Sequence, residues 1–230
     1  MTIKLVLILV FLLLILIFFR KWLLKLFRLL YLSSKYGKFS HEFISYFKEN
    51  NLVSPYNTCI KDQITSHFLI FNKQINHTDE FQTEIPIDFD GIPFMVTSKN
   101  LIQRKGNPDC INVATLSDFK FMVMGYSEFM LDLKMKAMFF FLDDHFIMGE
   151  FSFSEGKSAQ SAKMIETISS KYLNGNPIGK EFFFLKDKDG NQLNFENNGF
   201  TISIKYLFRG DHTTNMILSG SYSNGDNLSE

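Results

Sequence analysis

Residues 3–19 carry the most uniform hydrophobic pattern in the chain. From Leu5 to Phe19 every residue is apolar, and the run holds no charge, Gly or Pro. A helix of a soluble domain buries one stripe, so a segment that is apolar on all sides is typical of a membrane span. The 17 residues from Ile3 to Phe19 reach the short end of the length that crosses a bilayer, roughly 17–25 residues. The pattern predicts a transmembrane anchor over residues 1–19.

A cleaved signal peptide is the alternative interpretation of this start. Cleavage needs small residues after the apolar run. The run ends instead in Phe18, Phe19, Arg20 and Lys21. An uncleaved anchor is therefore favoured.

Residues 20–32, RKWLLKLFRLLYL, mix basic and apolar positions at helical spacing. Lys21, Lys25 and Arg28 stand at i, i+4 and i+7 and share one helix face. This pattern predicts a basic amphipathic helix in the headgroup layer, continuing from the anchor. The alternative is that the span runs deeper and these residues end it. The candidate membrane-interface residues are Arg20, Lys21, Trp22, Lys25 and Arg28.

Residues 33–90 show weaker patterns and are predicted to form a connector. A break is expected at 33–37, followed by a short helix over His41–Asn50 with Ser40 as its N-cap. Residues 66–73, SHFLIFNK, form a possible strand. The polar, Pro-containing stretch 76–89 is expected to be extended and irregular.

Residues 91–208 show sharper periodicity and predict one α+β domain. A short helix is expected to begin at Thr97 or Ser98 and to end at Gly106, a residue that suits the position after a helix end. A second helix is expected from Ser158 or Ser161, and it ends before Gly175. The strands that alternation and apolar runs predict are 119–124, 129–141 and 146–153 in the first half, and 181–185, 192–195 and 200–208 in the second.

Both predicted helices precede a meander of strands, and Gly-Asn-Pro follows each helix at 106–108 and 175–177. The fold class predicted is α+β, an antiparallel meander sheet with two short helices on one face. The halves are either similar units or coincidentally alike, because Gly followed by Pro ends many helices. The residues expected in the core are Phe121, Leu133, Phe139, Phe151, Ile165, Ile168, Phe183, Ile202 and Ile204. The polar tail 209–230 is expected to be mobile.

Composition narrows the function classes. Lys plus Arg and Asp plus Glu are balanced at 24 each, and the basic excess lies near the anchor. Nothing in this balance suggests a nucleic-acid surface. The 27 Phe residues favour an aromatic core over disorder. Cys59 and Cys110 lack metal-ligand spacing, and they are compatible with one disulfide or with two free thiols.

Two short clusters resemble chemical sites. Residues 143–145, Asp-Asp-His, lie between hydrophobic runs, where Asp is typical of a hairpin turn. Residues 187–191, DKDGN, resemble part of a calcium loop, but Leu185 occupies the position of the first oxygen ligand, so a hairpin turn is favoured here too. No paired His spacing, nucleophile elbow or phosphate-binding loop is present. No catalytic, cofactor-binding or metal-binding residue is predicted, and no enzyme activity is expected.

The function expected is that of a single-pass, membrane-anchored binding or scaffold protein that docks a protein partner. The alternatives are a bacterial immunity-type inhibitor of a toxin acting at the membrane, and a membrane-bound enzyme with an unrecognised site. Six basic residues follow the span closely: Arg20, Lys21, Lys25, Arg28, Lys35 and Lys38. Since such residues stay on the cytoplasmic side, the domain is expected in the cytoplasm, with the periplasm or cell exterior as the alternative.

Overall fold

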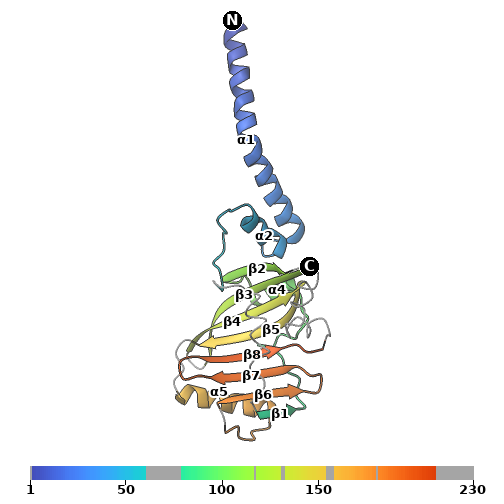
Figure 1. Ribbon diagram of the computed structural model, residues 1–230, viewed down its shortest axis with the longest axis vertical. Helices are drawn as coiled ribbons and strands as arrows, with labels where there is room; N and C mark the ends of the chain where they lie inside the picture. Colours follow the sequence, from blue (N-terminus) through green and yellow to red (C-terminus); the bar gives the residue numbers. More distant parts are fainter. Residues whose placement is uncertain are drawn as a thin grey trace, which may run out of the picture. The chain divides into compact units, whose positions relative to one another are not determined.

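The computed structural model shows a mixed α+β protein (Figure 1). It describes residues 2–60, 79–116, 118–130, 133–153, 158–179 and 181–210. The chain divides into two compact units, Met1–Ser54 and Pro55–Glu230. The first is helical and the second contains the sheet. The predicted strand at 66–73 and almost all of the predicted tail lie outside the described residues.

The first unit consists of α1 (Thr2–Tyr36) and α2 (His41–Glu49), which contact each other. α1 runs through both predicted segments, 1–19 and 20–32, as one continuous helix. The predicted break began too early, because the helix continues through Tyr36 and ends only at Gly37, whose φ is +95°. The N-cap prediction is confirmed: the Ser40 hydroxyl accepts a hydrogen bond from the Phe43 amide at 3.2 Å.

Among the residues that the structure describes, no helix reaches the length and apolar character of a membrane-crossing segment. The anchor over residues 1–19 and the interfacial helix over 20–32 therefore stay predictions from the sequence.

The second unit is built on a sheet of eight strands in the order β1-β6-β7-β8-β5-β4-β3-β2. The strands are β1 (Asp79–Thr83), β2 (Cys110–Leu116), β3 (Phe119–Met130), β4 (Leu133–Leu142), β5 (His145–Phe153), β6 (Phe182–Asp187), β7 (Gln192–Asn197) and β8 (Ile202–Leu207). Their neighbours pair antiparallel, except that β1 pairs parallel with β6.

The two helix-plus-meander halves are present in the predicted order. α4 (Ser98–Lys105) precedes β2–β5, and α5 (Ser158–Tyr172) precedes β6–β8. α4 begins at Ser98, one of the two predicted starts, and the Thr97 hydroxyl caps it by accepting from the Asn100 amide at 3.3 Å. The β5–β8 pair joins the two meanders into one sheet. Whether the halves arose by duplication stays a hypothesis.

Three predictions about this sheet are wrong. β1 lies in the segment expected to be irregular connector, and its parallel pairing means that the sheet is not purely antiparallel. β2 was not predicted as a separate strand. β3 continues through Gly125 to Met130 where the pattern suggested two strands. Gly125 reads as a break in the sequence, but in the structure it makes room for sulfur atoms.

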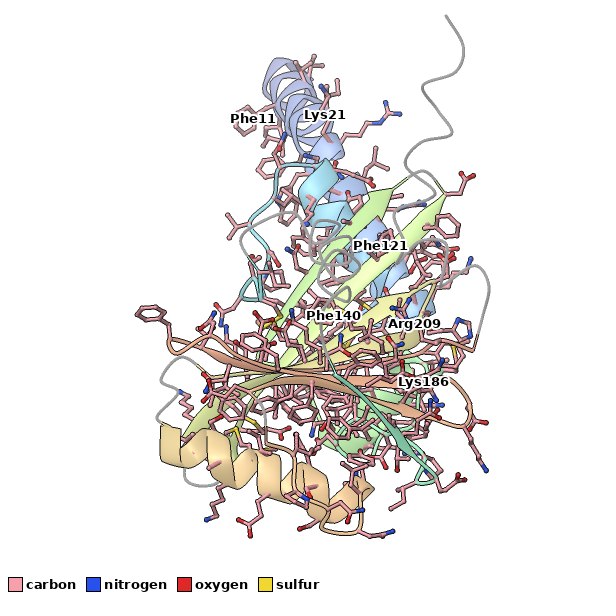
Figure 2. All side chains as sticks on the ribbon, turned by 60° about the horizontal axis from the view of Figure 1, so that its bottom comes forward. Phe11, Lys21, Phe121, Phe140, Lys186 and Arg209 are labelled. Carbon is pink, nitrogen blue, oxygen red and sulfur yellow. A yellow bond between two sulfur atoms is a disulfide. The ribbon has the colours of Figure 1, made fainter. Side chains whose placement is uncertain are left out.

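The helix-covered face of the sheet is the one on which α4 and α5 pack. Strand register and the alternation of side chains place the aromatic residues Tyr126, Phe139, Phe151, Phe195 and Tyr206 on this face. Figure 2 shows α5 lying along the sheet with side chains filling the space between them.

Of the nine predicted core residues, seven are buried as expected: Phe121, Phe139, Phe151, Ile168, Phe183, Ile202 and Ile204. Leu133 and Ile165 are only half-buried. Leu133 lies beside the β3–β4 turn, and Ile165 lies next to Met164, which takes the inward position on α5.

The opposite face of the sheet carries a second apolar cluster over β3, β4, β5 and β8. Its buried members are Ile60, Phe121, Val123, Met138, Phe140, Leu142, Ile147, Met148 and Leu207. Beside this cluster Cys59 and Cys110 form a disulfide, with their Cα atoms 4.9 Å apart. A Cβ at Gly125 would stand 2.5 Å from the Cys110 sulfur, so only glycine leaves room for the bond. Of the two states that the sequence leaves open, the structure shows the disulfide.

Candidate functional site

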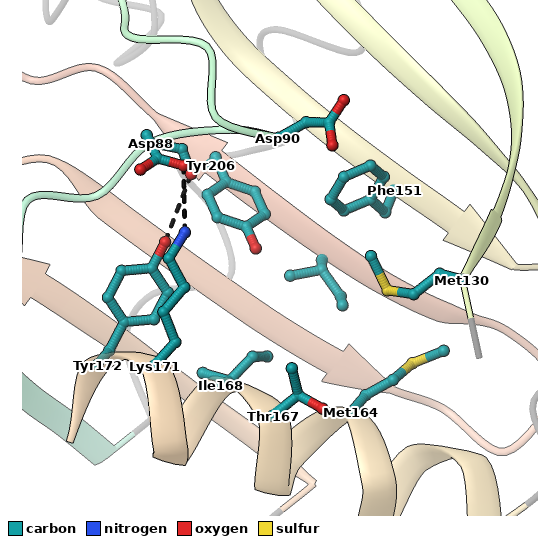
Figure 3. Close-up of a pocket in the computed structure, with 11 residues that line it drawn as sticks. Asp88, Asp90, Met130, Phe151, Met164, Thr167, Ile168, Lys171, Tyr172 and Tyr206 are labelled. Atoms are coloured by element: carbon teal, nitrogen blue, oxygen red, sulfur yellow. Dashed lines mark hydrogen bonds and ion pairs between the residues drawn. The ribbon is translucent and has the colours of Figure 1, made fainter. Parts of the chain in front are cut away.

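A cavity of about 200 Å³ lies on the helix-covered face, between α5 and the sheet. We call it the α5 cavity. Its lining residues come from the loop before α4, from three strands and from α5 (Figure 3). They are Asp88, Asp90, Met130, Phe151, Met164, Thr167, Ile168, Lys171, Tyr172, Ile204 and Tyr206. The site is thus assembled from segments far apart in sequence.

A tight turn places the two acidic residues. Phe89 and Ile92 exchange backbone hydrogen bonds of 3.2 and 2.9 Å around Asp90 and Gly91. Both central residues have positive φ, +56° and +68°, as in the type I′ turn that favours Asp-Gly. Phe89 is fully buried among aromatic rings, with its centroid 4.4 Å from that of Phe151. This side chain fixes the loop to the sheet, and Asp88 and Asp90 flank it.

Gly149 in β5 permits this anchoring. A Cβ at Gly149 would lie 2.2 Å from the Phe89 ring, which no real side chain could occupy without displacing the ring. The ring therefore rests directly on the strand backbone.

Asp88 connects the loop to the C-terminal end of α5. Its Oδ1 accepts from the Lys171 ammonium at 3.1 Å and from the Gly91 amide at 3.1 Å. The Tyr172 hydroxyl donates to the Asp88 carbonyl at 3.4 Å, and the Thr83 hydroxyl donates to the Tyr172 carbonyl at 2.6 Å. These bonds join the loop and β1 to the C-terminal end of α5.

Asp90 forms an ion pair with Lys105, a residue that does not line the cavity. The Lys105 ammonium forms ion pairs with Asp90 and Glu128 and lies 5.6 Å from the ring centroids of Tyr126 and Phe139. Burial lowers the pKa of Lys105, but hydrogen bonds and charge from Asp90 and Glu128 raise it by more, so the net shift is upward. Lys105 therefore stays protonated at neutral pH.

Lys171, Tyr172 and Tyr206, which line the cavity, also favour their protonated forms. Burial lowers the pKa of Lys171, but Tyr172 and Asp88 raise it by more. Burial raises the pKa of Tyr172, and it raises the pKa of Tyr206 well above its ordinary value. At neutral pH these three residues are thus one ammonium and two neutral phenols, which are hydrogen-bond donors rather than bases or nucleophiles.

A second, wider hollow of about 530 Å³ lies on the opposite face. We call it the opposite-face hollow. It is lined by Cys59, Ile60, Ser127, Lys134, Met135, Lys136, Met138 and Ser152. The side chains of Lys134 and Lys136 are exposed, so the hollow has a basic border.

The predicted membrane-interface residues belong to the first unit. Arg20, Lys21, Trp22, Lys25 and Arg28 all lie in α1, and all are exposed. The Trp22 ring meets the Phe19 ring edge-on at 6.4 Å, and the Arg28 guanidinium lies 5.7 Å from the Tyr31 ring centroid. The structure brings none of the five into either hollow.

Both short acidic clusters are turns, as predicted. Asp143 and Asp144 have positive φ between β4 and β5. Asp187 is buried, and its carboxylate accepts from the amides of Ile87, Asp189 and Asn191 at 2.8–2.9 Å. The oxygens that resembled a calcium ligand are thus satisfied by the protein backbone.

Sequence reasoning missed the α5 cavity. One signal was present: Asp90-Gly91 between apolar residues is a strong hairpin pattern, and it would have marked the loop as structured. Nothing local pairs Asp88 with Lys171, because the two residues are 83 positions apart.

Comparison of the chain with protein-family models, with curated proteins and with solved structures finds no match.

Proposed function

We propose that the chain is a single-pass membrane protein whose sheet-containing unit is a non-enzymatic binding module that docks a protein partner. The observation that carries the anchor is the uncharged run over residues 3–19, followed by the basic face of Lys21, Lys25 and Arg28. A helix of 17 residues is about 26 Å long, close to the ~30 Å of a bilayer core. Apolar side chains exposed on several sides of α1, such as Val6, Phe11 and Ile17, support a lipid environment.

The protein partner is supported by three exposed phenylalanines at one end of the sheet. Phe129, Phe182 and Phe200 are 75%, 44% and 84% exposed. Strand register places all three at the end where β3 turns into β4, β6 begins and β7 turns into β8. Large aromatic side chains are typical anchors of protein interfaces. We call this surface the aromatic end.

The partner's chemistry follows from what lies beside the aromatic end. Phe129 pairs across strands with Lys134, which also lines the opposite-face hollow. A partner surface that carries apolar side chains together with Asp or Glu would complement the phenylalanines and lysines.

The enzyme alternative has less support. The α5 cavity does gather titratable groups, as an active site would. The raised pKa values of Lys171, Tyr172 and Tyr206 nevertheless remove these residues as nucleophiles or bases near neutral pH.

Two observations point to opposite sides of the membrane for the sheet-containing unit. The basic residues after the span favour a cytoplasmic domain, whereas the Cys59–Cys110 disulfide favours an oxidising compartment. We give precedence to the disulfide, because large domains are translocated largely regardless of nearby charge. The proposal therefore adopts the periplasm or cell exterior, the alternative of the sequence analysis.

Membrane extraction and photo-crosslinking test this function. The chain should stay in the pellet when membranes are washed with alkaline carbonate, and release into the wash would contradict the anchor. A photo-reactive phenylalanine analogue at Phe200 should form a crosslink to a second protein in intact cells. The same analogue at Gln103, an exposed position on α4, is the matched control. Equal crosslinking at both positions would contradict docking at the aromatic end.

The side of the membrane is tested separately by alkylation. Cells are quenched in acid, and thiols are then modified with a maleimide that shifts the band on a gel. Under the proposal Cys59 and Cys110 react only after reduction. Reaction without a reducing agent would return the domain to the cytoplasm.

A further inference from the structure

The α5 cavity has a polar rim and an apolar interior. The interior side chains of Phe151, Met164, Ile168 and Ile204 are buried. At the rim, the side chains of Asp88, Asp90 and Lys171 are 36%, 31% and 46% exposed. A ligand that fits this arrangement has an apolar body and one polar head. Two methionines, Met130 and Met164, line the space and can adjust to the shape of the body.

The cavity volume sets the size of that body. An apolar cavity of roughly 150 Å³ is large enough for benzene, and the α5 cavity holds about 200 Å³. The body is therefore one aromatic ring with a short side chain, or an alkyl chain of similar volume.

The charges of the rim select the head group. Among the lining residues there are two carboxylates and one ammonium. Asp88 uses Oδ1 for Lys171, and Asp90 uses Oδ2 for Lys105, which does not line the cavity. The second oxygen of each carboxylate has no hydrogen-bond donor in the part of the chain that the structure describes. The two carboxylates would repel an anionic head group. A cationic head group could instead donate hydrogen bonds to their unused oxygens.

Tyr206 supplies an independent indication of a ligand. It is only 8% exposed, and its hydroxyl points into the cavity in Figure 3. No hydrogen bond joins this hydroxyl to another described residue. Among the described residues, the fully enclosed side-chain atoms without a hydrogen-bond partner are Glu150 Oε2 and Asn194 Oδ1. The Tyr206 hydroxyl is therefore open to the cavity and can form a hydrogen bond with a ligand there.

We propose that the α5 cavity binds a small primary amine with an apolar body about the size of one aromatic ring. Its ammonium head can donate to an unused oxygen of Asp88 or of Asp90 and to the Tyr206 hydroxyl. The faces of Phe151 and Tyr206 add attraction for a cation. This site lies on the helix-covered face and is independent of protein docking at the aromatic end.

Three probes of matched shape test the head group: 2-phenylethylamine, 2-phenylethanol and 3-phenylpropionate. Binding to the full chain in detergent is measured by equilibrium dialysis against empty micelles. The amine should bind at least about tenfold more tightly than the alcohol, which corresponds to ~1.4 kcal/mol, and the acid should bind most weakly. Equal binding of the three probes, or tighter binding of the acid, would overturn the proposal.

Variants of the rim residues test whether the rim causes the preference for the amine over the alcohol. Asp90→Asn should weaken amine binding about tenfold and leave alcohol binding unchanged. Lys171→Met should strengthen amine binding, because it removes the competing ammonium from Asp88. Glu166→Gln is the matched control, since Glu166 is an exposed carboxylate on α5 that does not line the cavity. If the Asp90 and Lys171 variants bind the amine as Glu166→Gln does, the proposal fails.

A larger side chain in the interior tests whether the apolar body of the ligand binds there. Met164→Phe should reduce binding of both the amine and the alcohol, and its circular dichroism should match that of the parent. Tyr206→Phe removes only the hydroxyl, so it serves as a second variant if Met164→Phe does not fold, and it should weaken the amine more than the acid. Unchanged amine binding in a folded variant of either kind would contradict the assigned location.

Discussion

The two faces of the sheet are held to the rest of the domain in different ways. The helix-covered face is closed by α4, α5 and the loop that carries Phe89, through aromatic packing and ion pairs. The opposite face is apolar over β3, β4 and β5, where it carries a covalent bond between Cys59 and Cys110. The helix-covered face thus depends on the fit of side chains, whereas the opposite face adds to its apolar packing a bond whose existence depends on the compartment.

The largest expected effect comes from the helix-covered face. Phe89→Ala removes a fully buried ring and should lower the free energy of unfolding by about 3–5 kcal/mol. Phe200→Ala, at an exposed position, is the matched control and should change it by less than about 0.5 kcal/mol. Denaturant unfolding of the full chain in detergent measures both. Equal effects would mean that the loop around Phe89 does not contribute to the core.

The opposite face should show a smaller effect that depends on redox conditions. The disulfide closes a chain separation of 51 residues, and its loss should cost about 2–4 kcal/mol. The double variant Cys59→Ser, Cys110→Ser should therefore unfold at lower denaturant, and a reducing agent should lower the stability of the parent to the same level. If the reducing agent also destabilises the double variant, the effect does not come from this bond.

The smallest expected effect is a loss of stability at alkaline pH, and it comes from the helix-covered face. Burial, with the charges of Asp109 and Glu128, raises the pKa of Tyr126 to about 12. The unfolded chain loses this proton near pH 10 and then binds fewer protons than the folded chain, so stability falls as pH rises from about 10 to 12. The loss should be no more than about 2.7 kcal/mol, the free energy that corresponds to a shift of about two pKa units.

Tyr126→Phe checks this assignment. Its hydroxyl donates to the Gly106 carbonyl at 3.2 Å, so the variant should be less stable by about 1 kcal/mol at neutral pH. Above pH 10 its stability should fall less steeply than that of the parent. A parallel decline in the two proteins would assign the alkaline loss to other groups.

Burial on one face or on both faces of a strand also explains which strands could be predicted from the sequence. β7 and β8 alternate between buried and half-buried positions, so their sequences show the period of two and both were found. β3, β4 and β5 are buried on both faces along much of their length. Doubly buried strands have continuous apolar sequences without a period of two. The boundary between β3 and β4 was misplaced because Gly125 interrupts this apolar run within β3.

The starts of α2 and α4 were predictable because their capping signals are local. Ser40 and Thr97 each cap a helix with their own hydroxyl. The α5 cavity was not predictable in this way. Its contacts join the loop at Asp88 to α5 and β8, and no short-range pattern encodes which distant segment will lie beside another. β1 was missed for the same reason, because DEFQT shows no alternation and pairs with a strand 104 positions later.

The disulfide also determines how the sheet would bear mechanical force. A pull on the first unit, which ends at Ser54, enters the second unit through Asn57 and Cys59. With the bond formed, the covalent path passes directly to Cys110 in β2, and the chain between the two cysteines carries no load.

With the bond reduced, only non-covalent contacts join this segment to β2, such as the 2.9 Å hydrogen bond from the Ile111 amide to the Asn57 carbonyl. Once these contacts break, tension travels along the chain to β1. β2 and β1 are the two opposite edges of the sheet. The redox state of one bond therefore selects the edge from which the sheet would be pulled apart.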